Sequence, residues 1–139
     1  MTPVKPSSPR PSRTLPWLWP FMLVLGSAAL VVAWSSLALA SGNQHGWMAL
    51  LAALEAAWML RLGGMRTLLA LAATVAMIAC VQWIVASGHI GAQMGLAPWQ
   101  AMPKMGAGYV WLLSRMANTG VDLLCLALAP LLAAWAARR

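Results

Sequence analysis

Charged side chains are scarce in this chain of 139 residues, of which only 8% are charged while 62% are hydrophobic. In soluble domains, about a quarter of the residues are usually charged. A chain so poor in charge has too few polar groups to cover its own surface, so we expect it to use lipid as its solvent. The composition therefore indicates an integral membrane protein.

Motifs for catalysis and for cofactor binding are also lacking. The sequence has no nucleotide-binding loop, glycine-rich phosphate cradle, Ser-His-Asp set or His-x-x-x-His pair, so we expect neither an enzyme nor a bound cofactor. Its two cysteines, Cys80 and Cys125, fall inside apolar segments and form no Cys-x-x-Cys pair. That placement favours a packing role over a disulfide framework or a zinc site.

Soft metal ligands are present, but their spacing is irregular. His89 shares a predicted loop with Met94, Met102 and Met105, and His45 is predicted on the same side of the membrane. Imidazole and thioether groups suit Cu(I). Methionine is common throughout, with 10 in the chain, so interfacial packing is the better interpretation and no metal site is predicted.

Four apolar segments follow a polar tail. Residues 1–16 are basic and rich in Pro and Ser, which predicts a disordered cytoplasmic tail. Helices are predicted at residues 17–40, 47–62, 67–87 and 109–137. We therefore expect an all-α fold, a bundle of four transmembrane helices over residues 17–139 with both termini inside.

The predicted connections differ in length. Residues 41–46 form a short polar turn, and the two glycines at 63 and 64 predict a hairpin, because one helix over 47–87 would be about 60 Å long, twice the hydrocarbon thickness. Residues 88–108 contain five glycines and two prolines and predict a long outer loop. The middle of that loop has the composition of a short interfacial or re-entrant piece.

The first 40 residues also resemble a secretory signal peptide. A basic start and an apolar run precede Ala38-Leu39-Ala40, which has the form of a cleavage site before Ser41. The apolar run of 24 residues is longer than the usual signal core, so we expect an uncleaved helix.

Positive charge is distributed unevenly over the predicted topology. With both termini inside, seven basic residues lie on the cytoplasmic side and Lys104 lies in an external loop, as the positive-inside rule requires. This asymmetry explains the net charge of +7 without a nucleic-acid partner. The bias toward Ala, Leu, Gly, Arg and Trp is typical of a GC-rich bacterial genome, so we expect a multi-pass protein of the bacterial inner membrane. The seven residues are Lys5, Arg10, Arg13, Arg61, Arg66, Arg138 and Arg139.

A few polar side chains interrupt the predicted helices. Arg115, Asn118 and Asp122 are three and four residues apart, so they share a helical face that we expect to point into the bundle. Depth along antiparallel helices places Glu55 and Gln82 near Arg115, and Thr74 near Asp122. An ionisable group inside a membrane costs a few kcal/mol, so it marks either a structural layer or a transport site, and the structural interpretation is favoured. The candidate layer comprises Glu55, Gln82, Arg115, Asn118 and Asp122.

Two functional classes follow from these features. The first is a non-enzymatic accessory or assembly subunit of a membrane complex, with lipid, further copies of itself or other membrane subunits as partners. The alternative is a small proton-coupled transporter that uses Glu55, Asp122 or both. In size and number of helices the chain resembles the small multidrug resistance transporters. Their essential glutamate lies in the first helix, whereas Glu55 lies in the second predicted helix, so the resemblance implies the architecture only.

Overall fold

The computed structural model describes residues 17–62 and 67–138, and within those ranges the chain is helical without strands. The predicted all-α class is therefore confirmed for the described part. The basic tail and the paired glycines at 63 and 64 lie outside the described residues. The helices are α1 (Leu18–Ser41), α2 (Met48–Leu62), α3 (Thr67–Met94), α4 (Pro98–Ala101), the 3-10 turn η1 (Met102–Lys104), α5 (Ala107–Ala117) and α6 (Gly120–Ala136).

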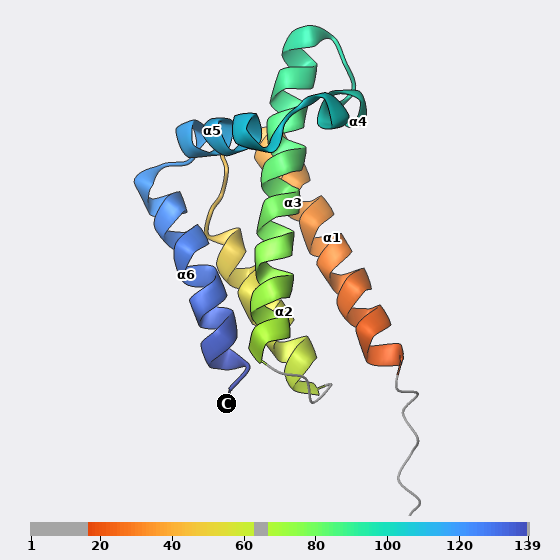
Figure 1. Ribbon diagram of the computed structural model, residues 1–139, viewed down its shortest axis with the longest axis vertical. Helices are drawn as coiled ribbons and strands as arrows, with labels where there is room; N and C mark the ends of the chain where they lie inside the picture. The colour runs from red at the N-terminus through yellow and green to blue at the C-terminus, as the bar shows by residue number, and fades with distance from the viewer. Residues whose placement is uncertain (1–16, 63–66, 139) are drawn as a thin grey trace, which may run out of the picture.

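Four of these helices run up and down side by side (Figure 1). Helices α1 and α3 run in one direction and α2 and α6 in the other. Both α2 and α3 pack against each other and against α1 and α6, so these two helices form the centre of the bundle. Alanines on α2 allow the backbones to approach closely, because they have no side chain beyond Cβ. Ala49, Ala52, Ala53 and Ala56 are fully buried.

Length separates the four helices into two pairs. Helix α1, with 24 residues, and α3, with 28, are long and apolar enough to cross a membrane. Helices α2 and α6 are apolar but shorter, with 15 and 17 residues. At 1.5 Å per residue these two span about 22 and 26 Å, against roughly 30 Å of hydrocarbon. Within the described residues, two helices thus meet the length criterion for a membrane span, where the sequence predicted four.

Helix α3 continues past the predicted end at residue 87 as far as Met94. The prediction of a loop from residue 88 was wrong because the glycines there serve close packing. A Cβ at Gly88 would lie 2.5 Å from a Leu39 methyl, and a Cβ at Gly91 would lie 2.7 Å from the Leu96 carbonyl oxygen. The chain then turns back, and the short helix α4 packs against α3.

The predicted helix over residues 109–137 is also corrected, because the structure breaks it in two. Helix α5 ends at Ala117, Asn118 is extended (φ −87°, ψ 135°), and α6 starts after Thr119. Figure 1 shows α5 lying crosswise above α6 and against α3. The sequence signal for this break is Thr119-Gly120-Val121-Asp122, a capping box ahead of an apolar run.

Candidate functional site

Hydrogen bonds around Asp122 fix the corner between α5 and α6. Its Oδ2 accepts from the N–H of Thr119 at 3.1 Å and from the Thr119 hydroxyl at 2.6 Å, while the Asp122 N–H donates to that hydroxyl oxygen at 3.3 Å. Its Oδ1 accepts from the N–H of Gly46, in the loop between α1 and α2, at 2.8 Å. Asp122 therefore holds both the start of its own helix and a distant loop.

Asp122 lies in the first turn of α6, ahead of the apolar residues 123–136. The N–H and O–H groups that donate to its carboxyl favour the charged form, because they stabilise a carboxylate.

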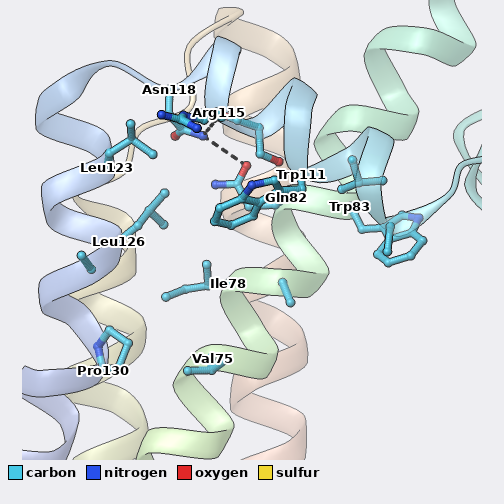
Figure 2. A pocket seen from close by; sticks show the side chains of 15 residues that line it. Val75, Ile78, Gln82, Trp83, Trp111, Arg115, Asn118, Leu123, Leu126 and Pro130 are labelled. Carbon is cyan, nitrogen blue, oxygen red and sulfur yellow. Dashed lines mark hydrogen bonds between the residues drawn. The ribbon is translucent and has the colours of Figure 1, made fainter.

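Below this corner, a groove of about 550 Å³ lies between α3, α5 and α6. Figure 2 shows its lower walls formed by apolar side chains of α3 and α6, with Val75 and Pro130 at the lower end. Helix α5 covers the upper end, where the polar side chains gather. The groove is lined by Val75, Ile78, Ala79, Gln82, Trp83, Ala107, Val110, Trp111, Ser114, Arg115, Asn118, Leu123, Leu126, Ala127 and Pro130.

The polar end of the groove has unsatisfied hydrogen-bonding capacity. Asn118 Nδ2 donates to the Ser114 carbonyl at 2.5 Å and weakly to Gln82 Oε1 at 3.4 Å. Three buried atoms have no hydrogen-bond partner: Gln82 Nε2, Ser114 Oγ and Asn118 Oδ1. Gln82 and Asn118 are each only 8% exposed. Buried polar atoms without a partner are rare and costly, so they point to a ligand or water at this position.

Arg115 places a positive charge at the same end of the groove. Its side chain is exposed and lies beside Asn118 in Figure 2. Neither carboxylate of the chain is its partner, because Asp122 bonds to Thr119 and Gly46 while Glu55 lines a different groove. The site therefore combines a cation, a donor and an acceptor above an apolar slot.

Glu55 lies on the other side of the bundle, facing α1. It lines a shallow groove with Gly26, Ala29 and Ala33, and its Oε1 occupies the space that a Cβ on Gly26 would need. Its Oε2 is buried without a hydrogen-bond partner. Glu55 and Arg115 thus line separate grooves.

Of the candidate polar layer, the structure brings Gln82, Arg115 and Asn118 together at one groove. Asp122 lies beyond the break, in the first turn of α6, and is bonded to its cap Thr119 and to Gly46. Glu55 does not join this group, and Thr74 bonds to the Ala70 carbonyl of its own helix at 2.8 Å. The sequence analysis did not predict that Ser114 lines the groove or that α5 covers its upper end. Both features depend on the break at Asn118.

The two histidines have separate surroundings. His45 Nε2 lies 2.7 Å from the Ser41 hydroxyl oxygen, and His89 Nδ1 lies 2.9 Å from the Val85 carbonyl oxygen of its own helix. Within residues 17–62 and 67–138, no three His, Cys, Asp or Glu side chains gather as a metal site would require.

Comparisons with family models, with curated proteins and with solved structures find no match for this chain.

Proposed function

We propose that this chain is an integral protein of the bacterial inner membrane with four spanning helices. Each helix of the bundle carries large apolar side chains on its outer surface, including Phe21 on α1, Trp58 on α2, Leu68 on α3 and Leu124 on α6. A soluble protein rarely exposes so continuous an apolar surface, whereas lipid covers it without cost. This exposure supports a membrane setting for α2 and α6 as well as for the two longer helices.

The short helices α2 and α6 fit the same setting. A bilayer adapts to a short helix by local thinning, and the flanking loop and α5 cover their upper ends. Seven basic residues of the sequence precede α1, flank the connection between α2 and α3 or follow α6, whereas the segment with η1 and α5 carries two, Lys104 and Arg115. The positive-inside rule then favours a cytoplasmic location for both termini and an external location for α5. Reporter fusions after Gln100 and after Arg139 test this orientation, and a periplasmic signal at Arg139 contradicts it.

In this orientation the protein acts as a non-enzymatic accessory protein that binds an amphiphilic molecule of the membrane. The groove between α3, α5 and α6 carries this proposal, because it offers an apolar slot inside the bundle and unpaired polar atoms at its end. An amphiphile satisfies both parts at once. Native co-purification from the source membrane tests the accessory role, and a second polypeptide in constant ratio is the expected result.

Filling the groove tests the binding site directly. Ala79→Trp places an indole in the groove from α3, whereas Ala28→Trp places one on the exposed face of α1, away from the groove. Native mass spectrometry of the detergent-purified protein counts retained lipids. We expect wild type and Ala28→Trp to retain at least one lipid that Ala79→Trp loses, with unchanged helical circular dichroism. Equal retention by both variants would place lipid binding elsewhere and overturn the proposal.

Proton-coupled transport is the second candidate function, and the unpartnered carboxylate oxygen of Glu55 in the groove beside α1 favours it. Asp122 is less suited to carry a proton, because its two oxygens are occupied by hydrogen bonds. Proton flux into proteoliposomes, followed with a pH-sensitive dye, separates the two candidates. A substrate-dependent flux that is absent in Glu55→Gln would favour the transporter.

A further inference from the structure

We propose that the groove between α3, α5 and α6 holds one anionic phospholipid of the outer leaflet, with its phosphate at Arg115 and an acyl chain between α3 and α6. This inference rests on the proposed lipid-binding function and names the class of lipid. It is carried by the charge at the groove, by the unpaired polar atoms and by the shape of the apolar slot.

Charge decides the sign of the headgroup. Arg115 is an exposed cation at the polar end of the groove, and neither Glu55 nor Asp122 is its partner. A guanidinium offers paired N–H donors that match two oxygens of a phosphate group, and this match is stronger than a hydrogen bond between neutral groups. A zwitterionic headgroup would add a second cation beside Arg115, which makes a singly negative headgroup the better partner.

The unpaired amides decide which further groups the headgroup carries. Gln82 and Asn118 are nine-tenths buried and line the groove, leaving one free donor, Gln82 Nε2, and one free acceptor, Asn118 Oδ1. The bond of Asn118 Nδ2 to the Ser114 carbonyl fixes the orientation of the Asn118 amide, and Gln82 Oε1, which accepts from the same Nδ2, fixes that of Gln82. A phosphodiester oxygen accepts from the donor, and a headgroup hydroxyl donates to the acceptor. Phosphatidylglycerol has both groups.

The apolar slot runs below these atoms in the direction of the lipid chains. Val75 and Gln82 on α3, and Leu123 and Pro130 on α6, mark its ends, which are about 10 Å apart along each helix. Helix α5 closes the slot above, and its Trp111 lies beside Gln82 at the headgroup level (Figure 2), where tryptophan is enriched in membrane proteins. A partner helix would fill the slot but leave the amides unpaired, so a lipid is the better occupant.

The experiment is a titration of the delipidated full-length protein in detergent with phosphatidylglycerol and, separately, with phosphatidylcholine of the same acyl chains. Native mass spectrometry measures the bound fraction. We expect wild type to prefer phosphatidylglycerol by about tenfold, the size of one charged hydrogen bond. Arg115→Gln should lose that preference. Lys104→Gln, which removes an exposed cation from the same end of the bundle outside the groove, should keep it.

Further arms separate the possible failures. Gln82→Met keeps the side-chain volume and removes the donor, so it should weaken phosphatidylglycerol binding without changing helical circular dichroism. Glycerol phosphate at millimolar concentration should not displace the lipid, and displacement would assign the site to a soluble phosphate. Equal binding of both lipids by wild type and Arg115→Gln would overturn the headgroup assignment alone. Binding of neither lipid, or a lipid-free dimer, would overturn the lipid-binding function itself.

Discussion

The carboxylate of Asp122 accepts a hydrogen bond from the backbone N–H of Gly46 at 2.8 Å, across 76 residues of sequence. This contact joins the loop between α1 and α2 to the first turn of α6. It explains why an apolar segment contains an acidic residue: Asp122 caps a helix and anchors a loop at the end of the bundle. Arg115 and Asn118 belong to the corner that precedes it, where α5 turns into α6.

Gly46→Ala should destabilise this corner. The added Cβ would lie 2.6 Å from the Asp122 Cα and 2.7 Å from its Cβ, which are distances that force the loop and α6 apart. Overpacking of this kind costs about 1–3 kcal/mol. Thermal unfolding in detergent, followed by circular dichroism, measures the change. Gly106→Ala is the matched control, since no atom lies within 4 Å of the added Cβ. Equal melting temperatures of the two variants would show that the loop does not pack on Asp122.

Glu55→Gln and Arg115→Gln should act independently. The two residues line separate grooves, so no pairing energy is shared. Changes at sites without common partners add to within about 0.5 kcal/mol. The double variant should therefore show the sum of the two single changes in unfolding free energy. If the double variant loses clearly less unfolding free energy than this sum, the two residues interact, as the ion pair predicted from their depth along the helices requires.

Residues 17–40 should belong to the mature protein. Trp34 is 1% exposed in the core, and its indole N–H donates to the Gln44 carbonyl at 2.9 Å. Removal of the segment would expose the buried faces of α2 and α3 that pack on α1. Intact-mass measurement on the purified chain tests this expectation, and a mature start at Ser41 contradicts it.

Trp34→Ala should lower the free energy of unfolding by about 3–5 kcal/mol, because removal of the buried indole leaves a large cavity.

The sequence by itself determined the helical class and the positions of the apolar segments. The ends of α1 and α2 lie within a residue or two of those predicted, because apolar runs bounded by polar turns are local signals. The capping residues Thr119 and Asp122 were also present in the sequence. The apolar composition of residues 109–137 nevertheless led to the prediction of one continuous helix. The extension of α3 had no local signal, since glycines usually mark turns.

Only the tertiary structure decided which polar groups meet. Spacing along a helix grouped Arg115 with Asn118, and both residues line the groove. It assumed one straight helix, however, and so did not predict that α5 covers the upper end of the groove. Depth along the helices placed Glu55 level with Arg115, whereas the rotation of α2 turns Glu55 toward α1. Rotation and helix breaks are set by packing between segments far apart in sequence, here by the contact of Asp122 with Gly46 and of Gly88 with Leu39. A linear pattern does not contain those contacts.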